Sequence, residues 1–133
     1  MEDMKVKKLI VHTDERGWLS EILRAEELEN KQFGQIIMTT AKKSIVKGNH
    51  YHTRKKEWYC VIKGRMKLVL KDRATGKVEE MILDGEELKT VKITPNISHG
   101  FKNIGGGMLY LLIYIDEPFD KDNPDTFPEQ VIG

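Results

Sequence analysis

Short segments rich in β-branched and aromatic residues recur along this chain, and clusters of Gly, Pro, Asn and Asp separate them. The segments that read as strands are 6–11, 18–24, 35–40, 58–63, 66–71, 78–83, 91–94, 100–104 and 108–115. Only 25–30 has helical character, and it is barely two turns long. This spacing of strands and turns is typical of a β-sandwich or barrel, so the chain is predicted to be all-β.

The composition supports one ordinary folded domain over 1–133, because 39% of the residues are hydrophobic and 32% are charged. From about residue 116 onward three of the four prolines occur, which predicts an irregular C-terminal strap. The formal net charge of +1 gives no support to binding of nucleic acid through bulk charge.

Two further features indicate a cytoplasmic protein that does not contact a membrane. The longest apolar run, Met108–Ile115, is too short to cross a bilayer, and the charged N-terminus lacks the apolar core of a signal peptide. The single cysteine, Cys60, fits a reducing compartment and is expected to be a buried core residue.

The pattern with chemical content is a histidine pair followed by a glutamate. Residues i and i+2 of a strand point to one face, so His50 and His52 are expected to project side by side. A short turn would bring Glu57 back on the neighbouring strand, and His99 follows a tight turn later in the chain. Three imidazoles and a carboxylate inside a small barrel suit Zn²⁺, Fe²⁺, Mn²⁺ or Ni²⁺.

A lone His-x-His on a strand is usually only exposed surface, and His12 is interpreted in that way, as structural or exposed. The pair at His50 and His52 differs because a glutamate, a turn glycine and a distant histidine accompany it. Their convergence favours a shared site.

These residues carry a resemblance to a known family. The segment from Gly48 to Gly64 resembles the first cupin motif in its H-x-H-x4-E-x6-G part, and His99 with Asn103 is similar to the end of the second motif. Asn96 stands where the second motif has glycine, and asparagine also tolerates a positive φ. The resemblance implies a double-stranded β-helix, the cupin jelly-roll barrel.

A narrower resemblance covers roughly residues 5–131. Segments 14–21, 33–35, 47–50 and 98–101 are similar to the dTDP-4-dehydrorhamnose 3,5-epimerase family. Segments such as 119–126 resemble even more the C-terminal cupin domain of bifunctional capsular-polysaccharide enzymes, which make UDP-N-acetyl-fucosamine precursors. The reductase domain of those enzymes is not in this sequence, so a separate reductase is an expected partner.

The resemblance implies an epimerase that acts at C3, or at C3 and C5, of a dTDP- or UDP-linked 4-keto-6-deoxyhexose for surface polysaccharide synthesis. It implies that His50 is the general base and Tyr110 the general acid. It also implies that Arg16, Gln35 and Lys47 contact the substrate or its diphosphate. Finally, it implies a homodimer in which an N-terminal segment, here about residues 5–24, is exchanged.

The metal remains open at this point. The capsular enzymes imply zinc held by His50, His52, Glu57 and His99, whereas the rhamnose epimerase needs no metal. His50 cannot bind a metal and remove a proton through the same nitrogen, so a metal-loaded site requires another base. A closed shell of four protein ligands is usually structural. The alternatives are therefore a non-catalytic metal- and sugar-binding cupin and a metal-dependent oxygenase.

Overall fold

The computed structural model describes residues 5–29 and 32–133. Its strands are β1 (Lys5–Lys8), β2 (His12–Asp14), β3 (Gly17–Leu19), β4 (Gln35–Ala41), β5 (Val46–Tyr51), β6 (Glu57–Lys63), β7 (Arg65–Asp72), β8 (Val78–Asp84), β9 (Lys89–Ile93), β10 (Ile97–Asn103), β11 (Leu109–Ile115) and β12 (Phe127–Pro128). The described helical structure is the 3₁₀ helix η1 (Ala25–Glu27). The prediction of an all-β chain is confirmed.

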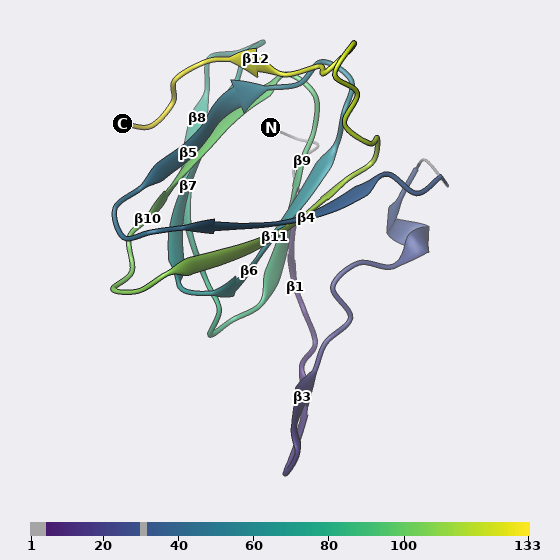
Figure 1. Cartoon of the computed structure of the whole chain (residues 1–133), viewed down its shortest axis with the longest axis vertical. Coiled ribbons are helices and arrows are strands. Elements are labelled where there is room, and N and C mark those ends of the chain that lie inside the picture. The colour runs from purple at the N-terminus through teal and green to yellow at the C-terminus, as the bar shows by residue number, and fades with distance from the viewer. Residues whose placement is uncertain (1–4, 30–31) are drawn as a thin grey trace.

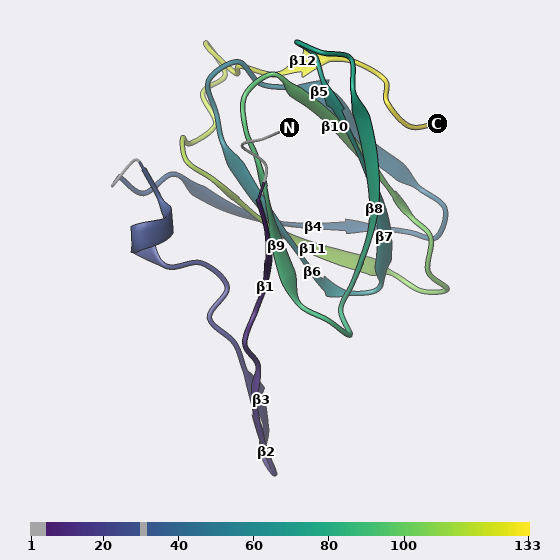
Figure 2. The same cartoon turned by 180° about the vertical axis from the view of Figure 1, so that it is seen from behind.

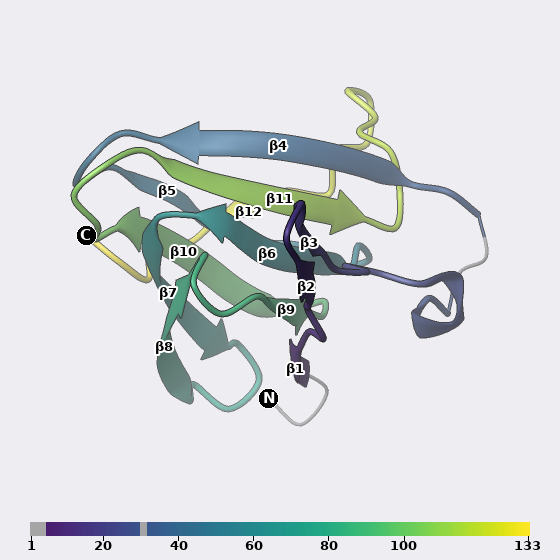
Figure 3. The same ribbon diagram turned by 90° about the horizontal axis from the view of Figure 1, so that it is seen from below.

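Two five-stranded sheets of the described chain face each other as the walls of a barrel (Figure 1). One sheet has the order β1-β9-β6-β11-β4 and the other β12-β5-β10-β7-β8, with antiparallel neighbours throughout. Figure 3 shows β4 and β11 side by side along one edge of the barrel. Because sequential strands cross between the sheets, the barrel is the expected jelly roll.

The core lies between the two sheets and follows the alternation of the strands. In β11, Leu109 and Leu111 point into the barrel and are fully buried, whereas Tyr110 lies on the outer face and is 38% exposed. The apolar run 108–115 is therefore buried on one face only in the first part of the strand. No second layer from the described part of the chain covers the outer face at Tyr110.

Strands β2 and β3 form an arm that stands away from the barrel (Figure 2). β2 and β3 pair only with each other, and Ile10, Trp18 and Leu19 are 75%, 54% and 62% exposed. The predicted strand 18–24 ends at Leu19, and the predicted strand 6–11 ends at Lys8. Residues 20–24 pair with no strand of the described chain.

Two other predicted segments have simple outcomes. Of the predicted helix 25–30, the structure forms only η1, and residue 30 lies outside the described part of the chain. The strap from Asp116 is irregular as expected, and it crosses the mouth of the barrel to pair with β5 through β12 (Figure 1).

None of the described helices has the length and apolar character that a membrane span requires.

Candidate metal and substrate site

Strands β5 and β10 of one sheet and β6 of the facing sheet bring the four predicted metal ligands together inside the barrel. His50 lies in β5, His52 directly follows it, Glu57 begins β6 and His99 lies in β10. His99 and His50 are opposite each other in the β5–β10 ladder. The predicted cluster therefore forms from segments almost fifty residues apart.

A β-bulge in β5 lies directly beside the position where His50 pairs with His99. His99 pairs with His50, but Gly100 pairs with Gly48, so Asn49 is an extra residue in the ladder. Gly48 has a φ of 85°, and a Cβ there would lie 3.1 Å from the carbonyl oxygen of His99. Only glycine fits this close, left-handed position without strain. Bulges of this kind re-aim side chains beside functional sites.

The four side chains are in direct contact. The ring centroids of His50 lie 5.2 Å from His52 and 4.7 Å from His99. Glu57 Oε1 lies 2.8 Å from His52 Nε2 and 2.9 Å from His99 Nε2. His52, Glu57 and His99 are buried, so water competes little for these polar atoms.

Backbone carbonyl groups set the orientation of two of the rings. His52 Nδ1 donates a hydrogen bond to the carbonyl of Asp125 at 2.6 Å, and His99 Nδ1 donates to that of Ile97 at 2.9 Å. A carbonyl can only accept, so Nδ1 carries a proton in both histidines. Their Nε2 atoms are thereby directed at Glu57, and carbonyl partners of this kind are typical of metal-ligating histidines.

The charges of the cluster are strongly perturbed. Burial alone would raise the pKa of Glu57, but the hydrogen bond from His52 and the closeness of His99 outweigh it and hold that pKa well below its usual range. Burial opposes protonation of His52, yet its bond to Glu57 raises its pKa. Burial, with the neighbouring His99, lowers the pKa of His50 to about 4. His50 is therefore a neutral imidazole at pH 7.

The cluster fits a divalent cation. One ring nitrogen of each histidine and one oxygen of Glu57 lie within 4.8 Å of one another. His99 Nε2 is fully buried and, despite its closeness to Glu57, makes no hydrogen bond within the described residues. It is thus a buried nitrogen available to a ligand, and a set of imidazoles with one carboxylate suits zinc and neighbouring transition metals.

A cavity of about 440 Å³ opens beside the cluster and contains two further predicted residues, Gln35 and Lys47. Gln35 Oε1 accepts a hydrogen bond from the Phe119 amide at 3.0 Å, which ties the start of β4 to the strap. Lys47 Nζ donates to Thr39 Oγ1 at 3.1 Å and to the Thr40 carbonyl at 2.7 Å. Lys47 itself is exposed, so its ammonium group can reach a ligand at the cavity mouth.

The structure does not bring Arg16 or Tyr110 to this cavity within one chain. Arg16 lies at the tip of the arm, where its guanidinium pairs with Asp14 at 2.6 Å. Tyr110 lies on the outer face of β11, opposite to the face that Leu111 and Ile113 present to the barrel. The general acid that the resemblance implied at Tyr110 therefore has no support from the geometry of a single chain.

The cavity also holds residues that the sequence did not single out. Lys55 and Tyr59 line it, and burial raises the pKa of Tyr59 well above its ordinary value. Asp125 accepts hydrogen bonds from the amides of Thr53 and Arg54 at 2.9 and 2.8 Å, which fixes the turn between β5 and β6. The Phe119–Thr126 segment carried part of the resemblance, but no pattern in it assigned Asp125 a contact.

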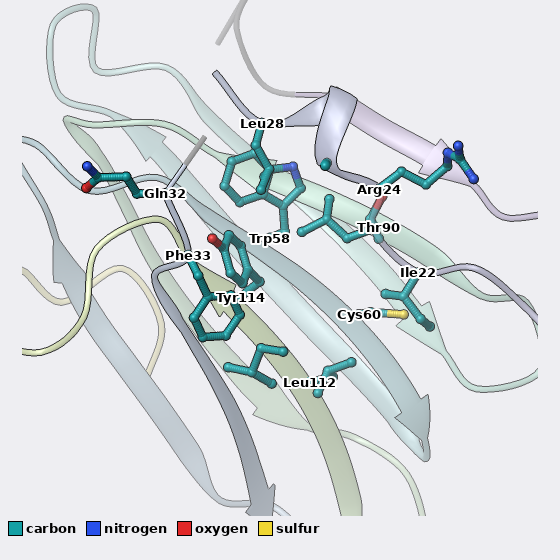
Figure 4. A pocket seen from close by; sticks show the side chains of 13 residues that line it. Ile22, Arg24, Leu28, Gln32, Phe33, Trp58, Cys60, Thr90, Leu112 and Tyr114 are labelled. Carbon is teal, nitrogen blue, oxygen red and sulfur yellow. The ribbon is translucent and has the colours of Figure 1, made fainter. Parts of the chain in front are cut away.

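A second cavity of about 420 Å³ lies on the outer face of the β1-β9-β6-β11-β4 sheet (Figure 4). It is separate from the histidine cluster. The side chains of Phe33, Trp58 and Tyr114 lie together there, with ring centroids 5.8 Å apart for each neighbouring pair. Cys60 lies at its wall, is buried as expected, and has a pKa raised by burial to about 11. The thiol is therefore uncharged and unreactive at neutral pH.

The fold and the motif define a cupin-type barrel, and a comparison with protein families identifies the family. Residues 12–127 match the family described as the polysaccharide biosynthesis C-terminal domain, and the chain belongs to that family.

Known relatives agree with this assignment. The chain is 32% identical over 117 residues to UDP-2-acetamido-2,6-beta-L-arabino-hexul-4-ose reductase of Pseudomonas aeruginosa, a match that covers 88% of this chain and 30% of that protein. It resembles the capsular polysaccharide assembling protein CapF of Staphylococcus aureus at 27% identity and a TM-score of 0.72, over 92% of this chain and 33% of that one. The chain thus spans about a third of the length of these relatives.

A third similar structure covers most of both chains. It is the dTDP-6-deoxy-D-glucose-3,5-epimerase RmlC of Legionella pneumophila in complex with dTDP-4-keto-L-rhamnose, at a TM-score of 0.86 and 19% identity. The match covers 99% of this chain and 75% of that one. At this identity the likeness shows the fold, and the expected cupin jelly roll is confirmed.

Proposed function

We propose that this chain epimerises C3, or C3 and C5, of a 4-keto-6-deoxyhexose linked to a nucleoside diphosphate, in the synthesis of a surface polysaccharide. The observation that carries the proposal is the barrel cavity in which His50, a neutral imidazole, lies beside Gln35 and Lys47. Relatives named as a nucleotide-sugar reductase and a 3,5-epimerase support the substrate class.

The chemistry needs a base and a place for negative charge. A ketone at C4 acidifies the hydrogens on C3 and C5, and a neutral imidazole such as His50 can remove one of them. Return of a proton to the opposite face inverts the carbon. Lys47 at the mouth of the cavity is suited to the diphosphate, because its ammonium group is held by Thr39 and exposed.

We also propose that His50, His52, Glu57 and His99 hold a divalent metal, with zinc favoured by the donor set. When bound, such an ion would polarise the substrate ketone as a Lewis acid. His50 then keeps its nitrogen for the ion, and the proton is taken by another group in the cavity. Without a metal, His50 itself is the base.

Two partners belong to the proposal. A second copy of the chain would cover the apolar arm, since a hairpin of two three-residue strands is not stable alone. Any reduction of the product is assigned to a separate reductase or to sequence outside this chain. The buried, uncharged Cys60 fits the reducing cytoplasm expected for such an enzyme.

The test is hydrogen exchange on a defined sugar. Metal-analysed protein is incubated in D₂O with a UDP-linked 4-keto-6-deoxy-N-acetylhexosamine, and with the dTDP-linked 4-keto-6-deoxyglucose, and exchange at C3 and C5 is read by NMR. Deuterium at C3 supports the proposal, and exchange with and without a chelator separates the metal-dependent route from the His50 route. Folded, metal-loaded protein that exchanges neither sugar contradicts it.

One observation favours a second candidate, a non-catalytic metal- and sugar-binding cupin. Four protein ligand atoms within 4.8 Å would complete a tetrahedral shell with no position left for substrate. Binding of the UDP-sugar without any exchange at C3 or C5 would favour this candidate over the epimerase.

A further inference from the structure

Lys55 is a charged residue inside the barrel, with 4% of its surface exposed. It lies in the turn between β5 and β6 and lines the cavity that contains the histidine cluster. The basic residues on either side point elsewhere, because Arg54 pairs with Glu117 at 2.9 Å and Lys56 pairs with Glu29. One of three successive cations is therefore directed into the cavity.

Within the described chain no carboxylate lies within ion-pair distance of Lys55 Nζ. Lys55 Nζ lies 5.8 Å from the ring centroid of Phe119, another residue that lines the cavity. The carboxylate of the cavity, Glu57, is already held by His52 and His99. The Lys55 side chain thus lines the cavity with no counter-ion within the described residues, and an ammonium group so placed is suited to an anionic ligand.

The backbone of Lys55 is fixed before any ligand arrives. The Asp125 carboxylate accepts hydrogen bonds from the amides of Arg54 and Lys55 at 2.8 and 3.1 Å, and from Thr53 Oγ1. Asp125 is itself buried, which protects these bonds from water. A cation held in place in this way stabilises charge that develops in a reaction without a cost of reorganisation.

We infer that Lys55 Nζ holds the negatively charged oxygen that forms at C4 of the substrate, an inference that rests on the proposed function. When a base removes the proton from C3, the C–H electron pair forms a carbon–carbon double bond to C4, and the carbonyl electrons move to oxygen. The Lys55 ammonium donates a hydrogen bond to this enolate oxygen. Reprotonation of C3 returns the electrons and restores the ketone. Lys47, which is exposed at the mouth, is left for the diphosphate.

The variant Lys55→Met removes the charge and keeps the length of the side chain. Lys56→Met is the matched control, because Lys56 is adjacent but pairs with Glu29 outside the cavity. We expect Lys55→Met to lower the rate of C3 exchange by about a hundredfold or more, with a Kd for UDP within about twofold of the wild-type value. Lys56→Met is expected to exchange at the wild-type rate.

Each other result has a defined meaning. Wild-type exchange in Lys55→Met overturns the role of Lys55 and leaves the epimerase proposal intact. Unchanged exchange with weakened UDP binding would assign Lys55 to the diphosphate and also overturns it. Lys55→Met should melt at about the wild-type temperature, since Lys55 Nζ makes no ion pair within the described chain that the substitution would remove. A lower melting temperature identifies a structural lysine, unless Lys55→Arg restores exchange.

If the wild-type protein exchanges neither sugar, the proposed function fails and Lys55 is tested as an anion site with inorganic phosphate. Phosphate should then raise the melting temperature of the wild type and of Lys56→Met more than that of Lys55→Met. Equal shifts in the three proteins overturn the inference.

Discussion

At the scale of single residues, His52 is held by two different acceptors. Its Nδ1 donates to the Asp125 carbonyl and its Nε2 lies against Glu57, so both ring nitrogens carry protons in the absence of an ion. A cation at the cluster would take the place of the Nε2 proton. Metal affinity is therefore expected to fall as pH is lowered and this proton competes.

His52→Ala is expected to lower the metal content of purified protein from about one ion per chain to a small fraction of this value, because it removes a central ligand. His12→Ala is the control, since His12 is exposed on the arm. The measurement is plasma emission spectrometry after gel filtration. Full metal occupancy in His52→Ala would refute the four-ligand site.

The variant Tyr110→Phe tests whether Tyr110 is the general acid that the resemblance implies. Because Tyr110 lies on the outer face of β11, the variant is expected to exchange substrate hydrogens within about twofold of the wild-type rate. NMR in D₂O gives this rate. A loss of exchange would return Tyr110 to the mechanism, through a route that a single chain does not contain.

At the scale of elements, the strap and the arm differ in how they are held. The strap is bound to the barrel through Asp125, β12 and Asn49, whose side chain bonds the Val131 amide at 2.8 Å. Among residues 5–29 and 32–133, β2 and β3 of the arm form strand pairs only with each other. The strap is therefore part of the cavity wall, whereas the arm is the surface that we propose meets a second copy.

Asp125→Asn is expected to destabilise the protein by roughly 2–3 kcal/mol at pH 7, since buried amides of the turn lose their carboxylate acceptor. Burial opposes the charged form of Asp125, but bonds from Thr53 and its neighbours lower its pKa from 3.8 to about 2. The folded state thus favours the carboxylate, whose contribution is present above pH 3.8 and is lost as the pH falls towards 2.

The difference in unfolding free energy between wild type and Asp125→Asn should therefore shrink as the pH falls from 4 to 2. Urea unfolding followed by tryptophan fluorescence measures it. An equal difference at pH 7 and pH 2.5 would show that the carboxylate charge does not contribute.

Replacing Trp18 and Leu19 of the arm by glutamate is expected to convert a dimer into a monomer, because two charges then stand on the surface proposed to meet a second copy. Val78→Glu, an equally exposed apolar residue on β8, is the control. Light scattering gives the mass. A wild-type protein that is already monomeric contradicts the proposal.

At the scale of the whole molecule, a metal that binds only the folded barrel should stabilise it. At a hundredfold excess over Kd the gain is about 2–3 kcal/mol, so chelation should lower the melting temperature by several degrees. His52→Ala should show no such difference between zinc and chelator. Identical melting of the metal-loaded and chelated wild-type protein would contradict metal binding at the cluster.

How much of this molecule the sequence predicts depends on how far apart the contacts lie. The barrel and the cluster were accessible, because strand alternation fixes His50 beside His52 and the spacing returns Glu57 to them. The outward position of Tyr110 was not, since apolar residues on both faces of β11 leave no alternation to reveal the buried face. Its register against β6 also shifts between Tyr110 and Leu111.

Lys55 could not be separated from its basic neighbours, because its inward position depends on Asp125, seventy residues later in the chain. The prediction of a strand over 18–24 was wrong beyond Leu19 for a similar reason. Residues 20–24 alternate as a strand would, yet a strand also needs a partner edge, and none of the strands that the structure describes provides one there.

The carbonyl of Asp125 on the ring of His52 has a thermodynamic consequence. Because His52 joins the two, binding at the opposite nitrogen of that ring and docking of the strap on the barrel are expected to be coupled, and each then changes the equilibrium of the other by the same factor. The affinity of the site and the protection of the C-terminal segment from proteases are then two readings of a single equilibrium. A graft, tag or substitution that loosens the segment would weaken ligand binding without altering any residue that touches the ligand.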